Sequence, residues 1–244
     1  MEERNISWTP EIEEQKKLYE QFQQEFPIER LKTLTLEQYN NTKREDSFCY
    51  WIESKLKSNG SIQGATSYKF GIYEYKNKPR TDNGYSHDDK YAWLSKYGEN
   101  PIEAFENIRS NLVMIAKCAK SGDMNSIDNI DLSNMFKWKI AFLYSDCKFL
   151  NIFSEDSIRL LSKKYGLKNS DKATFSQMYK FLLSLKKEDE DVFAFAPKIW
   201  NEWLEYKNNE ENNSNIIKNS TQMKREKIAD YVTLLKNTRN LILT

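Results

Sequence analysis

The stretch between Gly60 and Tyr97 has the most evident chemical potential, because aromatic and cationic side chains are closely interleaved there. Aromatic rings can stack on unpaired bases, and lysine and arginine can neutralise phosphates. A base lifted from a duplex would be held between such rings and read along its hydrogen-bonding edge. The predicted DNA-binding side chains, two of which precede this stretch, are Lys55, Lys57, Lys69, Tyr73, Tyr75, Lys76, Lys78 and Arg80. The predicted base-stacking side chains are Tyr50, Tyr85, Tyr91 and Trp93.

Charge is distributed unevenly along the chain. Over all 244 residues, 37 lysines and arginines nearly balance 36 aspartates and glutamates, and the formal net charge is +1. Residues 41–80 carry eight cationic and four anionic side chains, a local charge of +4, whereas residues 186–211 carry four lysines and eight carboxylates, a local charge of −4. A basic region on a nearly neutral protein fits a molecule that meets a polyanion with one side. The alternative is an ordinary solvated surface.

Motifs of common enzyme classes do not occur in the sequence. There is no Gly-x-Ser-x-Gly, no His-Glu-x-x-His and no phosphate-binding glycine-rich loop. A nuclease motif of the Asp…Glu-x-Lys kind could include Glu53-Ser54-Lys55, but this tripeptide is short and lies on an expected helix. With His87 as the one histidine and three scattered cysteines, neither a multi-histidine metal site nor a disulfide framework is expected. We predict no catalytic residue, no metal site and no cofactor.

Most of the expected elements that position these side chains are helices. Apolar residues recur at three- and four-residue spacing, as they do on a helix with one buried side. Polar residues such as Ser47 can cap the starts of helices, and glycines such as Gly166 can end them. Tyr50, Ser54 and Lys57 share the polar face of the third helix. The expected helices span residues 10–25, 28–32, 48–58, 101–120, 154–165, 173–186, 196–207 and 221–235.

Alternating patterns predict strands in two places. Residues 67–75 read as a strand with one face in the core and the other presenting Lys69, Tyr73 and Tyr75. Residues 138–153 read as a hairpin. The polar segment that follows the first strand is expected to be a loop. These elements predict an α+β fold with a small antiparallel or mixed sheet flanked by helices, and with a helical C-terminal third.

The composition also predicts how the chain is divided. A stretch rich in asparagine and glutamate reads as a linker. No run of about 18 apolar residues occurs, and the N-terminus lacks the apolar core of a signal peptide, so a cytoplasmic protein without membrane contact is expected. The predicted parts are an N-terminal helical segment at 1–34, an α+β DNA-recognition domain at 35–207, a polar linker at 208–220, and a helix and strand at 221–244.

A set of short segments, spread over roughly residues 35–205, forms a recognisable pattern. They are 47–55 (SFCYWIESK), 60–73 (GSIQGATSYKFGIY), 91–93 (YAW), 96–98 (KYG), 137–144 (KWKIAFLY) and 151–153 (NIF). Together they resemble the region N-terminal to the AAA+ motor in McrB-type proteins of modification-dependent and related restriction systems. The chain departs from the family pattern at Ala65, where a second glycine is expected after Gly64. The family's loop geometry is therefore not assumed for this segment.

The C-terminus, with the apolar residues Leu241-Ile-Leu243 after a short helix, resembles the start of such a motor domain. In that family the strand leads into a nucleotide-binding Walker A loop; an ordinary apolar tail is the alternative. The resemblance implies a non-catalytic DNA-recognition module of a prokaryotic anti-phage restriction system, which in some members flips a modified base into an aromatic pocket. It further implies duplex DNA as a partner, an AAA+ motor domain in cis and a nuclease subunit in trans.

A second interpretation is a protein-interaction or phage-sensing module that makes no direct contact with DNA. The helical C-terminal third, with Trp200 and Trp203, would then supply the binding surface, although tryptophans more often lie in a core. If the DNA interpretation holds, replacing Lys69 and Tyr73 with alanine should weaken DNA affinity and leave the melting temperature nearly unchanged. A cryptic nuclease would instead nick DNA in a metal-dependent reaction.

Overall fold

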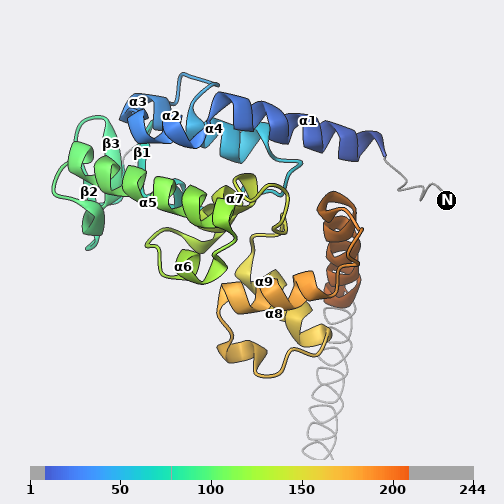
Figure 1. The fold of residues 1–244 in the computed structure, drawn as a ribbon. Helices are drawn as coiled ribbons and strands as arrows, with labels where there is room; N and C mark the ends of the chain where they lie inside the picture. The colour runs from blue at the N-terminus through green and yellow to red at the C-terminus, as the bar shows by residue number, and fades with distance from the viewer. Residues whose placement is uncertain (1–8, 78, 209–244) are drawn as a thin grey trace, which may run out of the picture. The chain divides into compact units, whose positions relative to one another are not determined.

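The computed structural model describes residues 9–77 and 79–208. The chain divides into two compact units, Met1–Ile199 and Trp200–Thr244. The first unit contains all the described strands, and helices outnumber strands in it (Figure 1). The protein is therefore an α+β protein with a small antiparallel sheet and a helical C-terminal part, as the sequence predicts.

The N-terminal helices belong to the core of the first unit. Helix α1 (Pro10–Glu25) starts at a proline and buries Phe22, and Phe26 follows its last turn. The rings of Phe22 and Phe26 lie 5.9 and 5.2 Å from the ring of Phe48. The short helices α2 (Ile28–Thr33) and α3 (Leu36–Tyr39) follow. The described part of the predicted N-terminal helical segment, residues 9–34, belongs to the first compact unit.

The helix expected over 48–58 is shorter and changes its winding. Helix α4 (Phe48–Tyr50) continues directly into a π-helical segment, η1 (Trp51–Lys55). The amide of Leu56 donates to the carbonyl of Trp51, 2.9 Å away and five residues earlier, which is the π-helical pattern. Segments of this kind are uncommon and often occur at functional sites.

The sheet has three short antiparallel strands in the order β1-β3-β2. Residues Ser67–Phe70 form a 3₁₀ helix (η2) rather than the expected strand, because Gly71 turns the chain with a φ of +81°. The segment expected to be a loop contains a strand, which pairs with its neighbour at Tyr85↔Leu94 and His87↔Ala92. The strands are β1 (Ile72–Glu74), β2 (Tyr85–His87) and β3 (Tyr91–Leu94), followed by a 3₁₀ turn η3 (Ser95–Tyr97).

Helix α5 (Pro101–Ser121) packs against this sheet and against helix α7 (Asn134–Leu143) (Figure 1). Its start is capped by the Asn100 side chain, which accepts hydrogen bonds from two backbone amides, and Gly122 ends it in a left-handed conformation. These local signals explain why the prediction of a helix over 101–120 is confirmed. The short helix α6 (Met124–Asp128) follows.

The hairpin predicted over 138–153 is wrong, because α7 (Asn134–Leu143) is a helix in the centre of the unit. The alternating pattern predicts strands, but every residue from Phe136 to Leu143 is buried. Even Lys137 and Lys139 lie inside, where their ammonium groups donate to backbone carbonyls. A helix that is buried on all sides carries no periodic signal.

The remaining described helices agree with the sequence patterns. Ser154 caps α8 (Glu155–Lys164), and Thr174 and Gln177 form a capping box at the start of α9 (Phe175–Ser184). A short 3₁₀ turn, η4 (Ser170–Lys172), lies between them. Residues 192–199 are helical and end the first unit.

The second unit is described over residues 200–208, which are helical. Trp200 and Trp203 stack on each other there with ring centroids 4.3 Å apart, and both are half-buried. The predicted linker beyond residue 208, the helix over 221–235 and the apolar strand at 241–243 lie outside the described residues. Among the helices that are described, none is both long and apolar enough to span a bilayer.

Candidate nucleic-acid interface

The predicted contact residues fall into three groups by exposure. Lysines 55, 57 and 76 and Arg80 are exposed, whereas Lys78 lies outside the described residues. The half-buried group consists of Tyr50, Tyr73, Tyr75 and Tyr85. The buried group consists of Lys69, Tyr91 and Trp93. The exposed and half-buried groups stay in the candidate interface, and the buried group leaves it.

Lys69 is a correction to the predicted interface. Its side chain is only 4% exposed, and its ammonium forms an ion pair with Glu53 and a hydrogen bond of 3.2 Å to the carbonyl of Ala65. The residue lies on η2 and not on an exposed strand face, because the strand begins three residues later. Lys69 therefore stabilises the fold and cannot reach a phosphate.

Tyr91 and Trp93 are corrections for the same reason, since both lie on the central strand β3 with 8% and 3% of their surface exposed. The indole nitrogen of Trp93 donates to the carbonyl of Gly98 at 2.9 Å, which fixes the ring in the core. A ring that is packed on both faces cannot stack on a base. Neither residue is a candidate for base stacking in this conformation.

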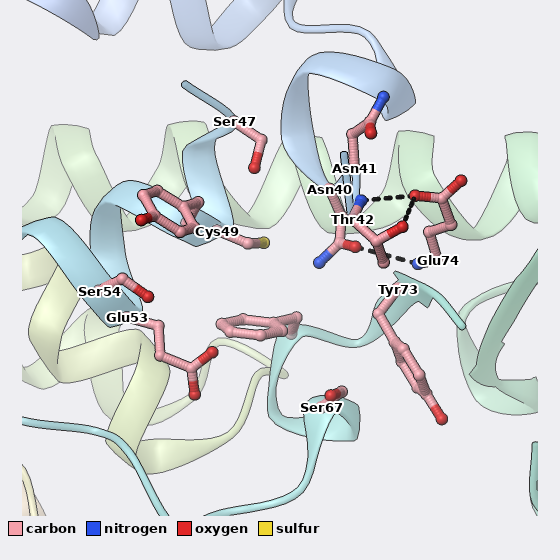
Figure 2. A pocket seen from close by; sticks show the side chains of 12 residues that line it. Asn40, Asn41, Thr42, Ser47, Cys49, Glu53, Ser54, Ser67, Tyr73 and Glu74 are labelled. Carbon is pink, nitrogen blue, oxygen red and sulfur yellow. Dashed lines mark hydrogen bonds between the residues drawn. The ribbon is translucent and has the colours of Figure 1, made fainter. Parts of the chain in front are cut away.

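A small open pocket lies between the 40–54 segment and the η2–β1 segment, and several of the remaining candidates line it (Figure 2). Its volume is about 160 Å³, which suits one small planar group and is less than the usual size of a drug-binding pocket. Three rings line it, those of Tyr50, Phe70 and Tyr73. The polar lining consists of Asn40, Asn41, Thr42, Ser47, Cys49, Glu53, Ser54, Ser67 and Glu74.

One side of the pocket is fastened by hydrogen bonds around Glu74. This carboxylate accepts hydrogen bonds from the backbone amide and the hydroxyl of Thr42 at 2.5 and 2.8 Å. The backbone amide of Glu74 donates to the side-chain oxygen of Asn40 at 3.0 Å. Partial burial alone would raise the pKa of Glu74, but the hydrogen bonds from Thr42 outweigh it and lower that pKa. These bonds join the 40–42 loop to the free edge of β1.

The opposite side is formed by α4 and η1. Figure 2 shows Glu53 and Ser54 across the pocket from Thr42, Tyr73 and Glu74. The Glu53 side chain is 31% exposed and is held by Lys69. The thiol of Cys49 also borders the pocket, and burial raises its pKa, so it stays protonated and is a poor nucleophile.

The C-terminal end of η1 is held from inside the molecule by Lys139. Its ammonium donates to the carbonyls of Leu56 and Gly60 at 2.8 and 2.5 Å, and the residue is fully buried. Burial lowers the pKa of Lys139 to about 7. A cation at a helix C-terminus interacts favourably with the backbone carbonyls there, so Lys139 fixes the segment that carries Glu53.

The exposed candidates lie beside this pocket on the same two segments. Lys55 ends η1, with its ammonium 4.2 Å from the ring centre of Trp51, and Lys57 follows it. On the sheet side, Arg80 donates to the hydroxyl of Tyr85 at 3.2 Å. The Tyr85 ring lies 4.3 Å from that of Tyr68, which in turn lies 4.9 Å from the ring of Tyr73. Cations and rings thus continue from the pocket onto the sheet.

Sequence reasoning missed most of the polar lining of the pocket. Asn40, Thr42 and Glu74 come together only because the 40–42 loop folds back onto β1. A partial signal was present in Tyr50 and Ser54, which share the polar face of a helix and which both line the pocket. Within residues 9–77 and 79–208, no group of three or more histidine, cysteine, aspartate or glutamate side chains could hold a metal ion.

Comparisons with protein-family models, with curated proteins and with solved structures found no match.

Proposed function

We propose that this chain is a non-catalytic DNA-recognition module that receives one unstacked base in the pocket between η1 and β1. The observation that carries the proposal is the composition of the pocket, in which the rings of Tyr50, Phe70 and Tyr73 lie beside acceptors such as Glu53. Rings of this kind can stack on a base, and polar groups can read its edge. The pocket is open to solvent, and its volume of about 160 Å³ is sufficient for a single base.

The exposed cations supply the second part of the proposal. Lys55 and Lys57 follow the pocket wall on one side, and Lys76 and Arg80 follow β1 on the other. Phosphates flanking an unstacked base would lie outside the pocket, where these side chains can neutralise them. The pocket would therefore recognise the base, and the surrounding cations would bind the phosphates of the DNA backbone.

The biological setting follows from the resemblance to the N-terminal region of McrB-type proteins. In that setting the chain would select the target for a prokaryotic anti-phage restriction system in the cytoplasm, together with an AAA+ motor domain in cis and a nuclease subunit in trans. A modified base is the corresponding ligand for the pocket. The chain itself would contribute recognition and no catalysis.

A titration of labelled duplexes, plain and base-modified, at about 50 and 200 mM salt tests the proposal. We expect binding that weakens steeply with salt, and we expect Lys57→Gln to reduce the slope of log affinity against log salt by about 1. The matched control is Lys168→Gln, which changes an exposed lysine on another segment and should leave the slope unchanged. Tyr50→Ala should weaken binding to the preferred duplex and leave the salt slope unchanged.

Failure to bind any duplex or single strand at either salt concentration would overturn the proposal. Capture of a protein from nuclease-treated infected lysate, together with that failure, would favour the protein-interaction alternative. Nicking of DNA by the isolated chain with magnesium or manganese would contradict a non-catalytic module.

A further inference from the structure

The two carboxylates that line the pocket are in different states. The carboxylate of Glu74 already accepts two hydrogen bonds from Thr42, and these bonds join a loop to β1. Glu53 is held through one oxygen, which accepts from the ammonium of Lys69. Its side chain keeps 31% of its surface exposed, so this carboxylate can accept further hydrogen bonds from a molecule in the pocket.

The position of Glu53 is set by two buried cations. Lys69 is fixed from the side of η2 by its second bond, to the carbonyl of Ala65, and it directs the carboxylate of Glu53. Lys139 holds the chain just after the π-helical segment, at Leu56 and Gly60, which lie three and seven residues after Glu53. Burying two lysines is costly, and the loss of hydration is recovered only through well-placed acceptors. Lys69 thus restricts the side chain of Glu53, and Lys139 restricts the backbone segment that carries it.

The chemistry of a fixed carboxylate determines what it selects. A carboxylate accepts hydrogen bonds and cannot donate them, so it favours a group with N–H donors and repels a carbonyl oxygen. Cytosine, adenine and guanine each carry an exocyclic amino group on the Watson–Crick edge, whereas thymine carries none and presents two carbonyl oxygens beside its one N–H. The lining serines, Ser54 and Ser67, can donate or accept and do not discriminate.

We propose that Glu53 is the specificity-determining residue of the pocket and that it selects a base bearing an amino group. This inference rests on the proposed function, because it assumes that the pocket receives a base. Lys69 is then a positioning residue, since it acts on the ligand only through Glu53.

The test uses hairpin DNAs that differ only in one unpaired nucleotide in the stem, which is cytosine, adenine, guanine, thymine or an abasic site, with a fully paired hairpin for comparison. We expect the full chain to bind at least one of the cytosine, adenine and guanine hairpins about tenfold more tightly than the thymine hairpin. Glu53→Gln keeps the size of the side chain but adds a donor, and it should reduce this preference to less than about twofold. Glu188→Gln, which changes an exposed carboxylate elsewhere, is the matched control and should keep the preference.

The outcomes separate this inference from the proposed function. If the wild-type chain binds paired and unpaired hairpins with equal affinity, or prefers thymine, the inference is overturned and DNA binding stands. A preference that persists unchanged in Glu53→Gln also overturns it, and a thermal melt of that variant shows that it is folded. If no hairpin binds, the proposed function fails as well.

Discussion

At the scale of single residues, burial separates the lysines that stabilise the fold from the lysines that are available to a ligand. Lys69, Lys137 and Lys139 are each buried, and their ammonium groups are held by carbonyls or by Glu53. Lys55 and Lys57 are exposed at the end of η1. The local charge of the 41–80 region therefore overstates the charge that a phosphate would meet, since Lys69 contributes to the interior.

Replacing Lys69 with methionine should lower the free energy of unfolding by about 1–3 kcal/mol, because Glu53 and the carbonyl of Ala65 each lose a hydrogen bond. The lower part of this range is expected, since Glu53 remains partly solvated. Urea denaturation measures the change, and Lys57→Met, at an exposed position, should stay within about 0.5 kcal/mol of the wild type. An unchanged stability with a strong loss of DNA affinity would instead place Lys69 in the interface.

The sequence located the region that carries the candidate cations and rings, but it could not show which of these side chains are exposed to solvent. Lysine and tyrosine in the 50–85 region are indeed on or near the surface in most cases, and Tyr50 and Tyr73 line the pocket. Lys69 and Trp93 were misplaced because their exposure depends on which face the rest of the chain covers. That information comes from tertiary packing and has no local signal.

At the scale of elements, the long helices with explicit end signals are predictable, whereas the short capped helices α3 and α6 and the buried helix α7 are not. Helices α5, α8 and α9 each have a polar cap, and the patterns located them. The sequence of helix α7 predicts strands, because complete burial removes the helical periodicity of apolar residues. The π-helical winding of η1 also left no sequence signal, although it sets how Glu53 enters the pocket.

Two glycines near the end of η1 provide an element-scale prediction, because their backbone angles are similar and the space around them differs. Gly60 and Gly64 both have positive φ, +93° and +89°. A Cβ atom on Gly60 would lie 2.2 Å from the carbonyl oxygen of Asn151, whereas nothing lies within 4 Å of one on Gly64. Gly64→Ala should cost about 1–2 kcal/mol from backbone strain alone. Gly60→Ala should cost at least about 2 kcal/mol more from the clash.

Chemical denaturation of both alanine variants under the same conditions measures this difference. The close approach matters for the pocket because the carbonyl of Gly60 is one of the two groups that Lys139 holds. Equal costs for the two variants would mean that the turn at Gly60 can move away from Asn151, and that it does not fix η1.

At the scale of the whole molecule, the burial of Lys139 couples folding to pH. Its pKa is about 7 in the folded chain and near 10.5 when unperturbed, so between these values the unfolded chain binds more protons. The free energy of unfolding should therefore rise from pH 7 to pH 8.5, by up to about 1.4 kcal/mol per pH unit. Lys137, whose pKa is also lowered by burial, acts in the same direction. Above this window, titration of thiols acts in the opposite direction.

Urea denaturation at pH 7.0, 7.75 and 8.5 checks this dependence. Lys139→Met removes the titrating group and should reduce the slope, although it also leaves the carbonyls of Leu56 and Gly60 without their donor and lowers stability at every pH. A stability that is flat or falls over this window in the wild type, or an equal slope in both proteins, would contradict the assignment of Lys139 as a buried lysine with a lowered pKa.

The central claim is that an unpaired base enters the pocket between η1 and β1, and photocrosslinking tests it most directly. A hairpin with a single unpaired 5-iodocytosine would be irradiated with the full chain, and the crosslinked peptide would be identified by mass spectrometry. The account predicts crosslinks to pocket residues such as Tyr50, Phe70 or Tyr73, and their loss with excess unlabelled hairpin. Efficient crosslinking confined to residues 155–208, or binding without any crosslink in the segments 40–54 and 67–74, would contradict it.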